Sequence, residues 1–291
     1  MDKYVAHNHL RHAVCPVCKA AEIGEVGALD YCGQVRFSTC EVQLSRIPEL
    51  WRCAICSSGF VQNAIDEPTS RYLYTLGVAG DRWSTQSFEC NKTRHVLRSL
   101  QAQFRPGMRV LDVGANTGML LDFAHQAGCL TAGLEYSDSS RSILRDKGHA
   151  AHSSFTEAGS GYDVITAFDL VEHLYDVPGF LQSCHERLAD GGRLVMLTGD
   201  IEAPSARLAA EHWWYVQYPE HIVFPSRTYL GSLSLFRLES LHRTYASVGY
   251  QRACLLGLVQ MLRKRLQGRH YNGLPSLGPD HMLVVLEKAG R

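Results

Sequence analysis

The chain has 291 residues, of which 45% are hydrophobic and 20% are charged. Such a chain has enough apolar material for a core, which excludes a mainly disordered protein. Its formal net charge is zero, and its one short basic run is Arg263-Lys264-Arg265 with Arg269. Proteins that grip a nucleic-acid backbone usually carry a basic excess or stripe, so this balance disfavours nucleic acid as a partner.

No stretch approaches the roughly 18 apolar residues that a membrane span needs. The first residues also lack the apolar core of a secretory signal peptide, so we expect a cytoplasmic protein. In that reducing compartment the ten cysteines should be thiols or metal ligands rather than disulfides. The oligomeric state is not predicted.

The chain divides into three predicted segments. Residues 1–65 carry six of the ten cysteines, with short β-like runs and turn glycines between them. Residues 66–105 look like a helical connector, with the clearest amphipathic stretch at 94–100. After the turn at Pro106-Gly107, residues 106–291 alternate strand and helix, which predicts an α/β domain with a doubly wound, mostly parallel sheet.

The expected elements of this third segment follow one another in a regular order. The strands are expected at 108–113, 130–135, 162–168, 193–198 and 281–287. The helices are expected at 119–127, from a cap at Asp138 or Ser139 to about Lys147, from near Pro178, and near 226–237.

A ligand site is indicated where the first strand ends. Asp112 ends the strand, and Gly114 and Gly118 precede the helix. Glycines let the backbone approach a ligand, and the helix N-terminus carries partial positive charge, which suits a carboxylate or a phosphate. Glu135 ends the next strand, where an acid can accept hydrogen bonds from ribose hydroxyls.

A dinucleotide site is the main alternative, and its fingerprint is G-x-G-x-x-G. Here Asn116 and Met119 stand in place of the second and third glycines, so a pyrophosphate would fit poorly. A strand-turn-helix with chance glycines is the remaining structural alternative.

The D-x-G-x-x-x-G run with an acid about twenty residues on resembles the first two motifs of class I S-adenosylmethionine-dependent methyltransferases. The segment 168–174, Phe-Asp-Leu-Val-Glu-His-Leu, resembles the D-x-x-E-H-x segment of ubiquinone-biosynthesis O-methyltransferases. Gly191-Gly192-Arg193-Leu194 is similar to the family's turn into its fifth strand. The resemblance covers about 105–290 and implies a seven-stranded Rossmann-like sheet that binds S-adenosylmethionine.

The resemblance also implies roles for individual residues. The first loop would surround the methionine part, Glu135 the ribose, Tyr136 and Phe155 the adenine, and Phe168 with Leu170 the sulfonium. The implied cofactor-binding residues are Asp112, Gly114, Ala115, Asn116, Gly118, Glu135, Tyr136, Phe155, Phe168, Asp169 and Leu170.

In the ubiquinone enzymes, residues that match Asp169, Glu172 and His173 can help bind a divalent cation. We favour a simpler interpretation, in which Asp169 caps a helix and Glu172 packs against His173.

The cysteines indicate a metal site. Cys15-Pro-Val-Cys18 and Cys53-Ala-Ile-Cys56 form two C-x-x-C pairs separated by 34 residues. Four thiolates make a closed tetrahedral site, which suits structural zinc. The separation exceeds the usual spacing, and Cys32, Cys40, His7, His9 or His12 could replace one ligand. The remaining cysteines are expected to be small buried hydrophobes, namely Cys90, Cys129, Cys184 and Cys254.

A zinc module of this type before this domain resembles a bacterial family linked to saccharide and natural-product tailoring, which implies a small-molecule or glycan acceptor. Methyl transfer needs alignment of the acceptor, and a base adds about 10²–10⁴-fold if the acceptor must lose a proton. The candidate bases are His173 and His221, with Tyr218 and Glu220 second to them. The aromatic connector 213–224 is either the acceptor wall or core packing.

Two other functions stay open. An RNA-modifying enzyme would use the zinc module to bind RNA, but residues 1–65 hold six basic and six acidic residues and show no basic face. A catalytically silent domain would bind the cofactor for stability or partner binding.

Overall fold

The computed structural model describes residues 3–6, 9–29, 34–37, 40–75, 92–245, 247, 259, 263, 266, 276 and 278–290. The predictions made for His7, Cys32, Cys90 and Cys254, and for Lys264, Arg265 and Arg269 of the basic run, lie outside these residues.

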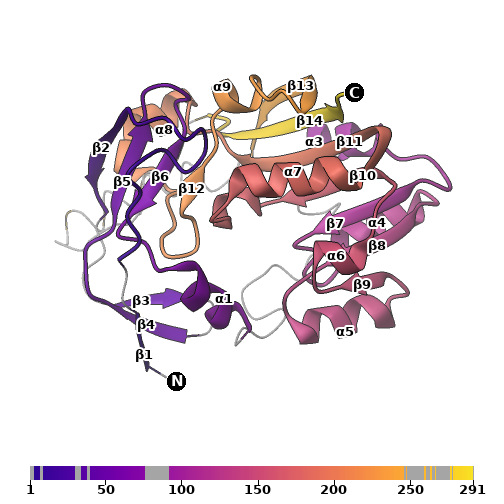
Figure 1. Ribbon diagram of the computed structural model, residues 1–291, viewed down its shortest axis with the longest axis horizontal. Coiled ribbons are helices and arrows are strands. Elements are labelled where there is room, and N and C mark those ends of the chain that lie inside the picture. The colour runs from indigo at the N-terminus through magenta and orange to yellow at the C-terminus, as the bar shows by residue number, and fades with distance from the viewer. Residues whose placement is uncertain are drawn as a thin grey trace.

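A mostly parallel seven-stranded sheet forms the centre of the fold, in the order β13-β14-β11-β10-β7-β8-β9 (Figure 1). Its parallel strands are β7 (Arg109–Val113), β8 (Leu130–Leu134), β9 (Ala150–His152), β10 (Tyr162–Phe168) and β11 (Leu188–Gly199). β14 (His281–Lys288) runs antiparallel between β11 and β13 (Phe236–Thr244). This topology confirms the predicted fold class.

Alternate residues of the strands pack on opposite faces of the sheet, as the period of two requires. Val110 and Val195 share a buried cluster with Val96 of α3 (Arg94–Gln101), whereas Leu111 and Met196 share one with the residues of α7 (Val177–Arg187). The other helices that follow β7 are α4 (Met119–Gln126), α5 (Asp138–Asp146), α6 (Phe155–Ala158), α8 (Pro204–Ala209) and α9 (Arg227–Leu230). Helices therefore cover both faces of the sheet.

The N-terminal strands form two small sheets. β1 (Lys3–Ala6), β4 (Cys40–Leu44) and β3 (Gln34–Phe37) make one sheet; β2 (Ile23–Ala28), β5 (Glu49–Cys53) and β6 (Gly59–Gln62) belong to the other. β12 (Val223–Phe224) pairs antiparallel with β6 and brings the aromatic connector, residues 213–224, into this second sheet (Figure 1). α1 (Glu67–Thr75) follows. The division of the chain into three segments stays a prediction. This sheet joins residues of the first segment to residues of the third.

Three local predictions were wrong. The helix expected near 226–237 is limited to α9, and β13 begins at Phe236. α5 is capped by Ser137, whose hydroxyl accepts from the N–H of Ser140, and not by Asp138 or Ser139. Asp169 caps no helix, since the short 3-10 turn Val171–His173 follows Leu170 without a side-chain cap.

Within the described residues, no helix is long and apolar enough to cross a membrane.

Candidate functional site

The loop after β7 packs closely against neighbouring side chains at its two glycines. Gly114 and Gly118 have φ angles of 76° and 79°, in the region that glycine alone adopts without strain. A Cβ atom on Gly118 would lie 2.6 Å from Leu144, and one on Gly114 would lie 3.0 Å from Leu170. The segment after β10 therefore packs directly against the first loop, and the two sequence motifs meet at one edge of the sheet.

Glu135 connects the ends of neighbouring strands. Its Oε2 accepts a hydrogen bond from the N–H of Asn116 at 2.9 Å, and its Oε1 accepts from the N–H groups of Tyr136 and Ser137 at 2.7 and 3.1 Å. The carboxylate thus lies where β7 and β8 end together. Tyr136 is 49% exposed, and the guanidinium of Arg71 on α1 lies 5.5 Å from its ring centre.

Asp112 is buried beneath this loop, with 5% of its surface exposed. Thr166 of β10 donates a hydrogen bond to its Oδ1 at 2.6 Å. Burial disfavours the charged carboxylate and raises the pKa of Asp112 to about 7.

Asp169 forms an ion pair that sequence reasoning missed. The Nζ of Lys92 lies 2.8 Å from the Oδ2 of Asp169 and 5.9 Å from the ring centre of Phe168. Burial alone would raise the pKa of this carboxyl group, but the charge and hydrogen bond of Lys92 act together with the nearby His281 and His221, and their sum holds the pKa of Asp169 below its usual value. No local pattern in the sequence marks Lys92, because it lies 77 positions before its partner.

Glu172, His173 and His221 form a cluster, and their candidate ligand atoms all lie within 4.8 Å of one another. Glu172 is fully buried and accepts from the hydroxyls of Thr198, at 2.9 Å, and Tyr215. Of the residues that the resemblance linked to a divalent cation, Glu172 and His173 lie beside His221, whereas Asp169 pairs with Lys92. Glu172 also contacts hydroxyl groups, in addition to the predicted packing near His173.

Backbone carbonyls orient both histidine rings. The Nδ1 of His221 lies 2.6 Å from the carbonyl oxygen of Tyr215, and the Nδ1 of His173 lies 2.9 Å from that of Glu220. A carbonyl only accepts, so we assign the proton to Nδ1 in each neutral ring, which leaves Nε2 as the basic atom. Burial lowers the pKa of His221 to about 3 and keeps the ring neutral.

The aromatic connector is largely buried. Trp213, Tyr215 and Tyr218 are each at most 3% exposed and pack with residues of the N-terminal segment. The Tyr218 hydroxyl accepts from the N–H of Ile65 at 3.1 Å, which anchors the connector to that segment. These contacts favour core packing for the three rings.

Two further side chains come from distant parts of the sequence, one against His173 and one against Tyr215. The hydroxyl of Tyr74 on α1 lies 3.1 Å from the Nδ1 of His173, and burial raises the pKa of this phenol. His281 at the start of β14 is fully buried with its ring 4.5 Å from that of Tyr215, and its Nδ1 lies 3.1 Å from Asp280. Neither belongs to a recognisable motif.

Phe155, expected at the adenine edge, begins α6, and the guanidinium of Arg187 lies 5.0 Å from its ring centre. Its ring also lies 6.2 Å from that of Phe180. These contacts place Phe155 against α7.

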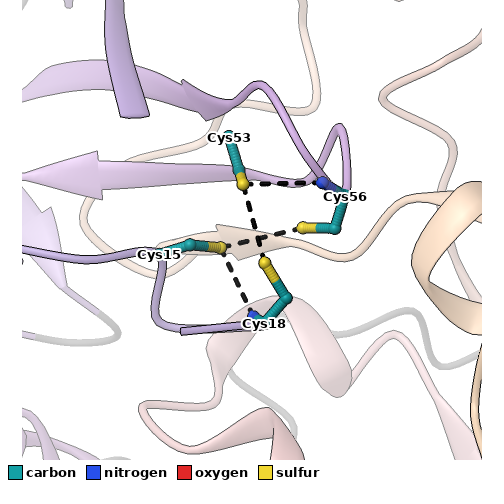
Figure 2. Close-up of side chains that lie close together, drawn as sticks. All are labelled: Cys15, Cys18, Cys53 and Cys56. Carbon is teal, nitrogen blue, oxygen red and sulfur yellow. Dashed lines mark hydrogen bonds between the residues drawn. The ribbon is translucent and has the colours of Figure 1, made fainter. Parts of the chain in front are cut away.

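The four predicted cysteines converge at one point (Figure 2). The Sγ atoms of Cys15 and Cys56 are 3.7 Å apart, and those of Cys18 and Cys53 are 3.6 Å apart. Two sulfurs bound to one tetrahedral zinc at about 2.3 Å would be about 3.8 Å apart, so the spacing fits the ion.

The backbone of each C-x-x-C turn supports its first thiolate. The N–H of Cys18 donates to the Sγ of Cys15, and the N–H of Cys56 donates to the Sγ of Cys53, both at 3.5 Å. Of the possible replacement ligands, Cys40 is buried in β4, and His12 packs edge-on against Phe60. Cys129 and Cys184 are buried as predicted.

Comparisons with known proteins find methyltransferases. The family model described as "Methyltransferase domain" matches residues 86–236. The ubiquinone biosynthesis O-methyltransferase of Sinorhizobium medicae is 30% identical over 115 residues, which cover 35% of this chain and 46% of that protein. That of Bradyrhizobium diazoefficiens is 30% identical over 118 residues, covering 38% and 46%. The chain therefore spans about half the length of these relatives.

Among solved structures, the YcgJ protein of Bacillus subtilis is 14% identical with a TM-score of 0.49, covering 68% of this chain and all of that one. The cyclopropane synthase MmaA2 of Mycobacterium tuberculosis is 16% identical with a TM-score of 0.48, covering 67% and 83%.

Proposed function

This chain belongs to the methyltransferase domain family, and on that premise we propose that it transfers a methyl group from S-adenosylmethionine to a small-molecule or saccharide acceptor. The observation that carries the proposal is the junction of the Gly114–Gly118 loop with Glu135. The loop offers backbone close to a ligand, and the Glu135 carboxylate stands at the neighbouring strand end to receive ribose hydroxyls.

The bound cofactor supplies an activated methyl group, so the chain's own task is to align the acceptor and receive its proton. His221 and His173 are the candidates for the second task, because both rings are assigned an unprotonated Nε2 and lie 4.8 Å apart between their centres. His173 is the stronger candidate, since the low pKa of His221 makes that ring a weak base. Tyr218 is a weaker candidate, since its hydroxyl binds the Ile65 backbone. Glu220 takes part through its carbonyl, which orients His173.

The four cysteines are proposed to bind one structural zinc ion. If all four thiolates bind, the zinc ion has no open coordination position for chemistry. Structural zinc sites have this closed arrangement. The zinc would hold the first strands of the N-terminal segment in place beside β12.

Isothermal titration calorimetry with S-adenosylmethionine tests the cofactor assignment. We expect saturable binding by the wild type, and roughly 10- to 100-fold weaker binding by Glu135→Ala, because two or more hydrogen bonds to the ribose are lost. Glu239→Ala removes a carboxylate of β13 that pairs with Arg193 and serves as the matched control. A wild type that does not bind the cofactor would refute the proposal.

Transfer of labelled methyl groups to a panel of saccharides and phenols tests the acceptor class and the base. Once an acceptor is found, we expect His221→Ala or His173→Ala to lower the rate by about 10²–10⁴-fold with cofactor binding retained. Wild-type rates in both variants would remove the histidines from the reaction.

A further inference from the structure

His281 begins β14, at the edge of the sheet where the parallel strands end. Because β14 runs antiparallel to β11, its first residue pairs with Gly199, the last residue of β11. An antiparallel strand that starts at this edge brings a side chain to the place where the loops after β7 and β10 lie. Ligands of open α/β sheets bind at this edge. His281 therefore stands among the residues of the candidate site, although it belongs to none of its sequence motifs.

Two observations place His281 beside the candidate bases. Its ring centre lies 4.5 Å from that of Tyr215, and the ring of His221 lies at the same distance from Tyr215. Besides burial, the charge of His281 also acts on the pKa of Asp169 and on that of His221. Such effects need charges that are close together. His281 thus lies near both the loop after β10 and the aromatic connector.

Asp280 holds one nitrogen of this ring. Its Oδ1 lies 3.1 Å from the Nδ1 of His281, and both side chains are fully buried. Burial alone would raise the pKa of Asp280, but His281, through its hydrogen bond and charge, and two further donors hold this pKa below its usual value. An ionised carboxylate only accepts hydrogen bonds, so the Nδ1 of His281 carries a proton. His281 differs in this from His173 and His221, whose Nδ1 atoms face backbone carbonyls.

The Nε2 of His281 is buried and has no hydrogen-bond partner among the described residues. With the proton on Nδ1, this nitrogen keeps an unused lone pair, and the carboxylate behind the ring makes it more basic. A buried acceptor without a donor is costly, and most such atoms in proteins are paired. The open nitrogen therefore points to a donor group that a ligand brings to this edge.

We propose that His281 binds the molecule that receives the methyl group, and that its Nε2 accepts a hydrogen bond from a hydroxyl or amine group of that molecule. This inference rests on the proposed function. Because the candidate bases serve the atom that is methylated, the group on His281 belongs to a neighbouring atom. The acceptor class is thereby narrowed to molecules with a second donor group next to the methylated one, as saccharides have. Asp280 is a positioning residue, since it fixes which nitrogen of His281 is free.

The competing interpretation is a purely structural link. The Oδ2 of Asp280 accepts from the indole N–H groups of Trp213 and Trp214, at 2.8 and 2.5 Å, so Asp280 also joins the aromatic connector to β14. A pair that only supports the connector affects every methyl acceptor equally. A residue that binds one group of the acceptor affects only the molecules that carry this group.

Pairs of methyl acceptors separate the two interpretations. Each saccharide or phenol that the wild type methylates is compared with analogues in which one neighbouring hydroxyl or amine group is replaced by hydrogen. We expect the wild type to prefer a parent over one analogue by roughly 10- to 100-fold in kcat/KM. His281→Phe should lose this preference by slowing the parent alone, and its affinity for S-adenosylhomocysteine should change by less than about threefold.

Two further variants complete this comparison. His281→Gln offers an amide oxygen in place of Nε2 and should retain part of the preference. His242→Phe removes an exposed imidazole from the neighbouring strand β13 and should keep all of it.

Nitrogen-15 NMR of the histidine side chains tests the ring without a methyl acceptor, with His281→Gln to assign the signal. In the wild type at neutral pH we expect the proton on Nδ1 and none on Nε2. In Asp280→Asn the two indoles should retain the amide oxygen at the position of Oδ2, so the amide N–H faces His281 and moves the ring proton to Nε2. This variant should also lose the preference for the parent acceptor.

Four outcomes would overturn the inference and leave the proposed function standing. They are a proton on Nε2 in the wild type, no preference within any pair, an unchanged preference in His281→Phe, and equal slowing of parent and analogue in that variant. If His281→Phe does not fold, Asp280→Asn replaces it, and an unchanged preference there has the same meaning. A wild type that methylates no member of the panel refutes the proposed function, and the inference falls with it.

Discussion

Asp112 shows at the scale of one residue how a buried carboxyl group costs stability. This group lies beneath the Gly114–Gly118 loop, with a pKa raised to about 7. In the unfolded chain an aspartate loses its proton near pH 4. Between these values the folded chain binds more protons than the unfolded chain, so the free energy of unfolding falls as the pH rises.

Asp112→Asn is expected to remove this loss, because the amide is uncharged and its oxygen still accepts from Thr166. Relative to the wild type, the variant should gain up to about 4 kcal/mol in free energy of unfolding between pH 4 and pH 8. Urea titrations of both proteins without cofactor at the two pH values measure this. A difference between the proteins that does not change with pH would contradict the raised pKa.

His221 provides the opposite case. Its folded pKa of about 3 lies below the ordinary value of 6.5, so the ring should stay neutral with its proton on Nδ1 as the pH falls from 8 to 4.5. Nitrogen-15 NMR of the histidine side chains checks this, with His221→Ala to assign the signal. A His221 resonance that titrates near pH 6.5 would show that the ring is solvated.

At the scale of elements, α9 and the second C-x-x-C turn support one another. Ser226 caps α9 by accepting from the N–H of Tyr229 at 2.9 Å, and its hydroxyl donates to the carbonyl of Cys56. Its N–H donates to the hydroxyl of Ser58 at 3.0 Å. One buried serine thus joins a helix start to a proposed zinc knuckle.

Ser226→Ala should therefore cost about 1–2 kcal/mol of free energy of unfolding, the upper part of the range for a helix cap, measured by denaturant titration. Ser154→Ala is the control, because the Ser154 hydroxyl caps α6 by accepting from the N–H of Glu157 and bonds to no other described residue. A loss no greater than that of the control would show that the bond to Cys56 contributes nothing.

The regular alternation of strands and helices was the part of the fold that could be predicted from the sequence. The strands at β7, β8, β10 and β14 and the start of α7 lie within a few residues of their predicted positions, because strands buried on both faces of a sheet are short continuous apolar runs. Residues 226–237 were predicted as a helix, but from Phe236 the chain pairs with β14. Such pairing depends on a partner more than forty residues away, which local periodicity cannot detect.

At the scale of the whole molecule, the aromatic connector adds β12 to the N-terminal sheet of β6, β5 and β2. Val223 and Phe224 pair with Phe60 and Gly59, and the connector between them and Trp213 carries His221. The proposed zinc site and the proposed base are therefore linked through a single sheet.

Loss of zinc should consequently loosen the connector as well as the N-terminal strands. We expect about one zinc per chain by elemental analysis in the wild type and in Cys129→Ser, and none in Cys53→Ser. Hydrogen exchange in Cys53→Ser should then rise in residues 49–62 and also in 213–226. A metal-free native protein, or faster exchange confined to the first 65 residues, would contradict this link.

The sequence by itself determined the fold class, the Gly114–Gly118 loop with Glu135 beside it, and the four cysteines that the structure brings together. Each of these features depends on residues that are close in the sequence, because a strand, a glycine turn or a C-x-x-C pair needs only neighbouring residues. Tertiary structure alone decided the partners of those residues. Lys92 on Asp169 and Tyr74 on His173 come from distant segments, and which buried charges meet depends on how the elements pack around the sheet.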